Sequence, residues 1–174
     1  MKKRRALELE SELLLGVSFS HSSEPDYTKI EVIQTFPGKG GSIDNRKLDK
    51  VPTELSYDGD KVTWGYQLPP GAPRFGCFKL LLDAKTGKTK FDDPNLGACI
   101  DSGNPNARLA LPRGKNATDL TEDYLRELYK HLMNRLEKRM LRTLESTPIQ
   151  FILTTPAIWS HEAQQQTSTL FSLF

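Results

Sequence analysis

Two glycine-containing stretches of the sequence are similar in composition to loops that bind phosphate. Gly87-Lys88-Thr89 matches the end of a P-loop, but that pattern needs a glycine five residues earlier, where this chain has Leu82. The stretch at 38–42 is rich in glycine, yet it lacks the GxGxxG spacing and a following helix. We therefore interpret the first stretch as a polar turn and the second as a loop.

The cysteines and histidines show no spacing that suits a metal site or a catalytic triad. Cys77 and Cys99 are 22 residues apart and form no CxxC motif, which excludes a zinc knuckle and a disulfide framework. His21, His131 and His161 are scattered, and no GxSxG motif supplies a nucleophile. The residue types alone therefore assign no reaction and no metal ligands.

Composition indicates one soluble domain or a large piece of one. The 174 residues include 24 Lys and Arg against 22 Asp and Glu, which gives a net charge of +2. This balance is too even for a nucleic-acid-binding stripe or a polybasic membrane anchor, so we expect neither nucleic acid nor membrane as a partner. The longest apolar run, 13–17, is far shorter than the roughly 20 residues of a membrane span. Glu8, Glu10 and Glu12 interrupt any secretory signal, so we expect a cytoplasmic protein.

The hydrophobic pattern predicts the elements that would position any site. We expect residues 1–12 to form a charged N-terminal tail, with a helix as one option. Strands are predicted at 13–19, 30–36, 54–57, 61–67 and 149–153, where apolar and β-branched residues run together or alternate. The pair Asp58-Gly59 favours a tight hairpin turn between the third and fourth of these strands, because glycine tolerates a positive φ.

A long helix is predicted over 119–145. Asp119 suits its N-cap, with Glu122 three residues later as in a capping box. Pro148 ends the helix before the strand at 149–153, and a final helix begins at Ser160 or His161. An apolar stripe with helical spacing faces the core and comprises Leu125, Leu128, Leu132, Leu136, Met140 and Leu144. Strands, a long helix and a further buried strand indicate an α/β fold with a mixed sheet.

Four segments in order carry a family resemblance. Residues 14–20 are similar to a strand and phosphate loop with the pattern Gly-Ile-Asp-Phe-Gly-Thr-Thr, and residues 51–57, with the hairpin ending at Trp64-Gly65, to a Pro-Ser-x-Val hairpin. Residues 78–82 resemble a segment that carries a catalytic lysine, and residues 151–159 a Val-Thr-Val-Pro-Ala strand and turn. These are features of the actin-like ATPases of the heat-shock protein 70 family.

The divergent fungal heat-shock-70-like proteins give the closest resemblance. Pro73-Arg74-Phe75, the leucine-rich segment around Lys79, the residues 128–131 and the residues 155–160 are similar to theirs. The family binds ATP and Mg²⁺ between two lobes of ribonuclease-H-like fold and couples this to chaperone-type activity. The resemblance implies that residues 13–174 form a partial ribonuclease-H-like lobe with a mixed sheet, a peripheral hairpin and one long helix.

The resemblance also implies where a nucleotide would bind. Lys79 takes the position of the lysine that places the attacking water and stabilises the transferring phosphoryl group. The phosphate loop falls on Gly16, Ser18, Ser20, His21 and Ser22. We therefore expect Lys79 to lie near this loop, and the strand at 149–153 to lie beside the strand at 13–19.

The chain departs from the family at the positions that matter for turnover. Ser18 stands where the family has the metal-facing aspartate, and Ser20 where it has a loop glycine. No second Asp-x-Gly-Gly-Gly-Thr phosphate loop occurs in the 174 residues. We therefore expect a truncated lobe that holds no metal and does not hydrolyse ATP.

Three alternatives stay open beside that expectation. The first is residual ATP binding through Lys79 and the altered loop. The second is an interaction module, with a protein partner or self-association through an exposed apolar C-terminus. The third is an incomplete gene model of a full-length ATP-binding protein. The apolar C-terminal residues are Leu170, Phe171, Leu173 and Phe174.

Overall fold

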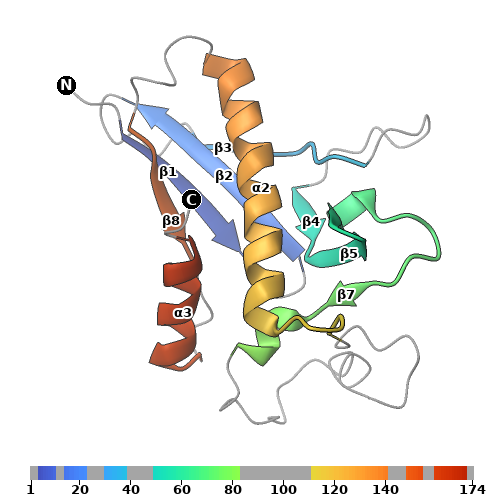
Figure 1. The fold of residues 1–174 in the computed structure, drawn as a ribbon. Helices are drawn as coiled ribbons and strands as arrows, with labels where there is room; N and C mark the ends of the chain where they lie inside the picture. The colour runs from blue at the N-terminus through green and yellow to red at the C-terminus, as the bar shows by residue number, and fades with distance from the viewer. Residues whose placement is uncertain are drawn as a thin grey trace.

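A computed structural model describes residues 4–10, 14–22, 30–38, 49–82, 111–140, 148–154 and 159–171 of the chain (Figure 1). Eight strands, two short 3₁₀ helices and two α-helices are assigned within these residues. In chain order they are β1 (Arg4–Glu10), β2 (Leu14–Ser22), β3 (Ile30–Val32), β4 (Lys50–Pro52), β5 (Glu54–Asp58), β6 (Lys61–Trp64), η1 (Gly65–Gln67), β7 (Phe75–Gly76), η2 (Phe78–Leu81), α2 (Ala117–Met140), β8 (Gln150–Leu153) and α3 (His161–Phe171).

The larger sheet has the strand order β3-β2-β1-β8, with β4 also paired to β2. Strands β1 and β2 are antiparallel, with Leu7 opposite Phe19, and β2 is antiparallel to β3 and β4. Strand β8 is parallel to β1, with Phe151 opposite Leu7. The sheet is therefore mixed, as the sequence predicted, and a parallel pair of this kind requires a crossover connection.

The smaller sheet contains the predicted hairpin. Strand β5 pairs with β6 on one side and with β7 on the other, all antiparallel. Asp58 is opposite Lys61, so Gly59 and Asp60 form the two-residue turn, and Gly59 has the positive φ of 58° that such turns need. The predicted strand at 61–67 ends at Trp64, because Gly65, with φ of 58°, turns the chain into η1.

Helix α2 packs a leucine stripe against both sheets, and the predicted stripe is confirmed for Leu125, Leu128, Leu132 and Leu136. Met140 is only partly buried, and Leu144 lies outside the described residues. Leu120, Tyr124, Leu128, Leu132 and Leu136 are all fully or almost fully buried. The same core contains residues of the larger sheet, residues 33–36 and the hairpin, including Val17, Phe19, Ile33, Phe36, Leu55 and Trp64. The hairpin belongs to a separate sheet, yet its Trp64 lies inside the main core.

The start of α2 differs from the prediction. The helix begins at Ala117, and its N-cap is Asn116, whose Oδ1 accepts a hydrogen bond from the Asp119 backbone N–H at 3.0 Å. In return, Asp119 Oδ2 accepts from the Asn116 backbone N–H at 2.8 Å. Asp119 is thus the reciprocal partner of a capping box and not the N-cap itself. The helix is described to Met140, and residues 141–147 lie outside the described residues.

Strand β1 was not predicted, and its presence corrects two expectations. Residues 4–10 are a strand and not a helical tail, because Leu7 and Leu9 alternate with Glu8 and Glu10 in the period of a strand. This strand lies between β2 and β8, so the strand at 150–153 neighbours β1 and not the residues 13–19 as expected. The strand predicted at 30–36 is regular only over Ile30–Val32.

Helix α3 buries Leu170, one of the four residues of the expected exposed apolar C-terminus. It packs against α2, and its Ala163, Thr167 and Leu170 are buried. Leu170 is only 7% exposed. The Phe171 side chain and residues 172–174 lie outside the described residues. Neither described helix is long and apolar enough to span a membrane.

Candidate functional site

The residues assigned to a phosphate loop lie in a regular strand. Gly16, Ser18, Ser20, His21 and Ser22 all belong to β2. On one side β2 pairs with β1, so that the residues at 16, 18 and 20 are opposite those at 10, 8 and 6. On the other side it pairs with β4 at 14–16 and with β3 at 18–20.

This pairing excludes a phosphate cradle at residues 16–20. A phosphate loop presents several backbone N–H groups that converge on one anion. In a strand paired on both sides, successive N–H groups point to opposite neighbours and are used by the ladder. Residues 16–19 are strand, as predicted for 13–19, because Val17 and Phe19 alternate into the core; the strand continues through Ser20, where the resemblance implied a loop.

Lys79 does not lie beside the end of β2. It is half-buried in η2, directly after the fully buried Phe78, and η2 packs against α2. Figure 1 shows η2 at the N-terminal end of α2, whereas the C-terminal end of β2 lies at the opposite end of that helix. The structure thus separates Lys79 from Ser20, His21 and Ser22.

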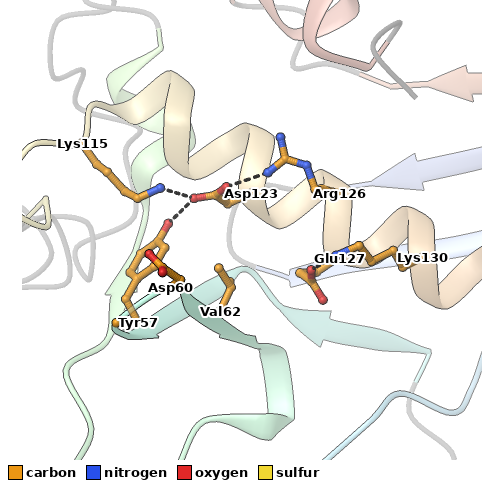
Figure 2. Close-up of a pocket in the computed structure, with 9 residues that line it drawn as sticks. Tyr57, Asp60, Val62, Lys115, Asp123, Arg126, Glu127 and Lys130 are labelled. Atoms are coloured by element: carbon orange, nitrogen blue, oxygen red, sulfur yellow. Dashed lines mark hydrogen bonds and ion pairs between the residues drawn. The ribbon is translucent and has the colours of Figure 1, made fainter.

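A polar cavity of about 270 Å³ lies between the β5–β6 hairpin and α2 (Figure 2). Its position was not predicted from the sequence. The hairpin supplies one wall, the residue before the N-cap of α2 supplies one edge, and successive turns of α2 supply the other wall. It is lined by Tyr57, Gly59, Asp60, Val62, Lys115, Asp123, Arg126, Glu127 and Lys130.

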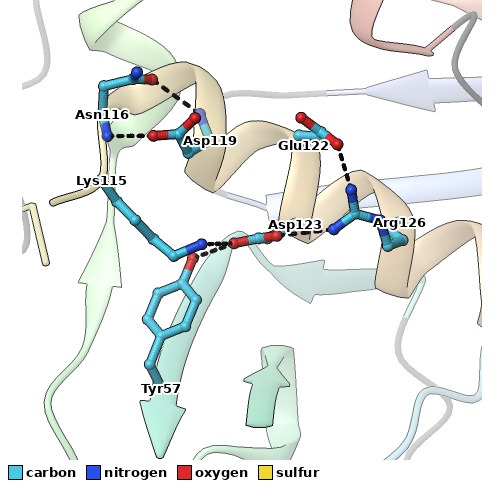
Figure 3. A network of polar contacts seen from close by, with 7 residues as sticks. All are labelled: Tyr57, Lys115, Asn116, Asp119, Glu122, Asp123 and Arg126. Atoms are coloured by element: carbon cyan, nitrogen blue, oxygen red, sulfur yellow. Dashed lines mark hydrogen bonds and ion pairs between the residues drawn. The ribbon is translucent and has the colours of Figure 1, made fainter. Parts of the chain in front are cut away.

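Asp123 is the centre of the polar network in this cavity (Figure 3). Its Oδ2 accepts a hydrogen bond from the Tyr57 hydroxyl at 2.9 Å and an ion-pair contact from Lys115 Nζ at 2.6 Å. Its Oδ1 accepts from Arg126 Nη1 at 3.0 Å, one helical turn away. The Asp123 side chain is only 11% exposed, so these three donors replace the water that the carboxylate loses on burial.

Tyr57 remains a hydrogen-bond donor over the whole physiological pH range. Burial raises the pKa of its phenol far above the ordinary value of 10, and the hydrogen bond to Asp123 and the Asp123 charge raise the pKa further. Lys115 Nζ also lies 4.8 Å from the centroid of the Tyr57 ring, where a cation is attracted to the ring face. Tyr57 and Lys115 therefore act together on one carboxylate.

The charges of the cavity compensate one another. Lys130 Nζ pairs with Glu127 Oε1 at 2.6 Å, and Arg126 pairs with Glu122 as well as with Asp123. The lining includes three cations and three carboxylates, so it favours neither an anion nor a cation. Among the described residues, no three His, Cys, Asp or Glu side chains are grouped to hold a metal ion.

The geometry indicates that this network fastens the hairpin to α2. Three donors occupy the oxygens of Asp123, which leaves little capacity to accept a proton or bind a substrate. The sequence contained no signal for it, because Tyr57 and Asp123 are 66 residues apart.

Comparison with known proteins adds no assignment. No protein-family model matches the sequence, and a search of curated proteins found no match. The fold defines the chain as a mixed α/β protein, with a five-stranded mixed sheet, a three-stranded antiparallel sheet and two α-helices in its described residues.

Proposed function

We propose that the chain is related to the first lobe of the heat-shock-70-like, actin-like ATPases, and that it does not turn over ATP. The lobe would have the ribonuclease-H-like fold of that family. The order of the sequence segments that resemble the family supports this proposal. The strand topology supports the fold alone and not the match of segments. An antiparallel meander β1-β2-β3 is followed by α2 and by β8 parallel to β1, so the first strand is β1 and not the matched residues 14–20, and this counts against the match.

The absence of ATP hydrolysis is inferred from the sequence that connects β1 and β2. In the family the phosphate loop follows the first strand, and in this topology the first strand is β1. The connection to β2 comprises only Ser11, Glu12 and Leu13. These three residues include no glycine that would allow close backbone approach to a phosphate.

The residues present do not fit ATP and Mg²⁺ in the manner of the family. Ser18, at the position matched to the metal-facing aspartate, is a neutral residue in the middle of β2. Phosphoryl transfer depends almost entirely on positioning and on charge stabilisation, so Lys79 alone cannot provide it. A cytoplasmic location belongs to the same proposal, and the buried Cys77 suits a reducing compartment.

The test is an ATPase assay on the purified chain with Mg²⁺, combined with ATP titrations with and without Mg²⁺. We expect no hydrolysis above the buffer rate. Lys79→Ala is the informative variant, and Lys138→Ala, at an exposed lysine of α2 outside the cavity, is its matched control. Mg²⁺-dependent hydrolysis that Lys79→Ala abolishes and Lys138→Ala leaves intact would overturn the proposal. Mg²⁺-dependent binding without hydrolysis, lost only in Lys79→Ala, would support residual ATP binding instead.

A further inference from the structure

The polar cavity between the hairpin and α2 has lining charges that alternate in sign along the chain. In order they are Lys115, Asp123, Arg126, Glu127 and Lys130. The last four belong to α2 at spacings of three and four residues, which place them on one side of the helix. An ion that approaches one of these groups is attracted by it and repelled by the groups beside it. The alternation therefore disfavours a ligand with a net charge.

Hydroxyl groups suit such a lining, because a hydroxyl both donates and accepts hydrogen bonds. The lining has capacity left for both roles. Lys115 and Lys130 each form one ion pair, although an ammonium group has three N–H donors. Glu127 contacts Lys130 through Oε1, and its Oε2 can accept from a ligand. A hydroxyl between an ammonium and a carboxylate can therefore bond to both.

Asp60 presents a carboxylate on the opposite wall of the cavity. It is exposed in the turn of the hairpin, and within the described part of the chain its carboxylate forms no hydrogen bond or ion pair. Figure 2 shows Asp60 on the hairpin, whereas Glu127 and Lys130 lie on α2. The two oxygens of a carboxylate can accept from two hydroxyls at once. A ligand with several hydroxyls can therefore contact both walls.

The cavity is also held in shape and has an apolar part. Tyr57 and Val62 are directly opposite each other in the β5–β6 pair, and Val62 offers its methyl groups to the carbon atoms of a ligand. The bonds of Asp123 to Tyr57 and Lys115 fix the walls before a ligand enters, which reduces the cost of ordering them. The volume of about 270 Å³ is below the range for drug-sized ligands, so it suits a smaller molecule.

We propose that this cavity binds a neutral, polyhydroxylated ligand of about the size of a monosaccharide. Asp60 and Glu127 accept hydrogen bonds from its hydroxyls, and Lys115 and Lys130 donate to them. Val62 packs against its carbon skeleton. The lining residues belong to the hairpin, to α2 and to the residue before its N-cap, and not to β2 or η2. The site is thus independent of whether the chain is related to the ATPases.

The experiment is a titration of the isotope-labelled full chain, followed by proton–nitrogen correlation NMR. The probes are D-glucose, D-glucosamine and D-glucuronate, which share one ring and differ in charge. We expect glucose to shift the amide signals of Gly59 and Glu127, one on each wall, and to leave that of Gln166 in α3 unchanged. No such shift at millimolar glucose would overturn the proposal. Binding of either charged sugar more than about tenfold tighter than glucose would also overturn it.

Asp60→Ala tests the carboxylate on the hairpin. It should weaken glucose binding about tenfold, because a hydrogen bond to a charged group is worth about that factor. Asp58→Ala is the matched control, since Asp58 is also exposed beside the same turn but does not line the cavity. It should bind glucose as wild type does. Undiminished binding by Asp60→Ala, or equal losses in both variants, would count against the proposal.

A second pair of variants tests the helix wall and applies also if a hairpin variant fails to fold. Lys130→Ala, at an exposed position of the cavity rim, should weaken glucose binding by a similar factor. Lys138→Ala, two turns further along α2 and outside the cavity, should not. Circular dichroism spectra like that of wild type show that the variants are folded. If folded Lys130→Ala and Lys138→Ala bind glucose equally well, the cavity is not the site.

Discussion

Helix α2 is held by different chemistry on its two sides. The hairpin contacts it through directional interactions, namely the hydrogen bond of Tyr57 to Asp123 and the edge-to-face contact of Trp64 with Tyr124. Helix α3 also packs against it; the buried residues of α3 include Ala163 and Leu170, and few of its residues are charged. Directional contacts set one register between two elements, whereas apolar contacts mainly remove surface from water.

The hairpin was expected to be peripheral, but it contributes a buried tryptophan to the core. The hairpin is outside the larger sheet, as predicted, but its Trp64 is buried and its ring contacts Phe36, Tyr124 and His131. These four rings join the hairpin, residues 33–36 and α2. The element that is peripheral in topology is therefore central in packing.

Replacement of Trp64 by alanine on the hairpin side should destabilise the fold more than any single replacement on the α3 side. Removal of a buried tryptophan leaves a cavity and typically costs about 3–5 kcal/mol of unfolding free energy. Leu170→Ala, on the α3 side, should cost about 2–3 kcal/mol. Urea denaturation followed by circular dichroism measures both. A larger loss in Leu170→Ala than in Trp64→Ala would reverse the comparison between the two sides of α2.

Gly38→Ala tests how the segment 33–38 is fastened near the hairpin. Gly38 has φ of 95°, and a Cβ there would collide with the backbone carbonyl of Tyr66 in η1. We expect a loss of about 2–4 kcal/mol, from strain and from displacement of that backbone. Gly59→Ala is the control, since Gly59 also has a positive φ but has open space around it. It should cost only about 1 kcal/mol. Equal losses would show that the Tyr66 contact contributes nothing.

Asp123→Asn tests the directional contacts themselves. The substitution keeps the size of the side chain but removes the charge that Tyr57, Lys115 and Arg126 share, and it should cost about 2 kcal/mol. It should also lower the pKa of Tyr57, because that pKa is raised partly by Asp123. Urea denaturation and ultraviolet titration of the tyrosines measure these effects.

Asp60→Asn is the matched control for that prediction. Asp60 lines the same cavity but is exposed in the hairpin turn. It should change stability by less than about 0.5 kcal/mol and leave the titration unchanged. If both substitutions behave alike, the network around Asp123 does not fasten the hairpin.

The parts of the fold with local signals could be predicted from the sequence. Asp58-Gly59 specified the hairpin turn, and the leucines at 128, 132 and 136 specified the buried face of α2. Strand β1 was missed because its arginines and glutamates resemble a solvated tail. Its alternation of Leu7 and Leu9 with Glu8 and Glu10 was the signal that could have found it.

The candidate site could not be predicted in the same way, because it depends on contacts between distant segments. Because β1 lies between β2 and β8, the connection that follows the first strand of the sheet is the one between β1 and β2. No local sequence pattern shows this order of strands. The meeting of Tyr57 with Asp123 likewise follows from the docking of the hairpin on α2. The resemblance of residues 14–20 to a strand and phosphate loop therefore placed the loop at residues that belong to strand β2.

The smallest effect expected concerns His131 and the pH dependence of stability. Its Nε2 lies 3.0 Å from the Thr35 backbone oxygen, and its ring packs on Phe36 and Trp64. Burial lowers the pKa of His131 below the ordinary 6.5, and the charges of Arg135 and Lys138 also lower it, against the raising effect of the Thr35 bond. The unfolded chain therefore binds the proton more readily than the folded one.

This sign means that the His131 contribution to stability is complete above pH 6.5 and is lost as the pH falls toward the lowered pKa. The unfolding free energy of wild type should therefore decrease between about pH 7.5 and about pH 5 by more than that of His131→Gln. His161→Gln, at an exposed position of α3, should keep the wild-type dependence. Urea denaturation at several pH values gives the three curves. Parallel curves for wild type and His131→Gln would mean that the ring titrates alike in the folded and unfolded chain. The aromatic contact between the hairpin and α2 would then be insensitive to pH, and only the charged network around Asp123 would remain to distinguish the two sides of α2 by titration.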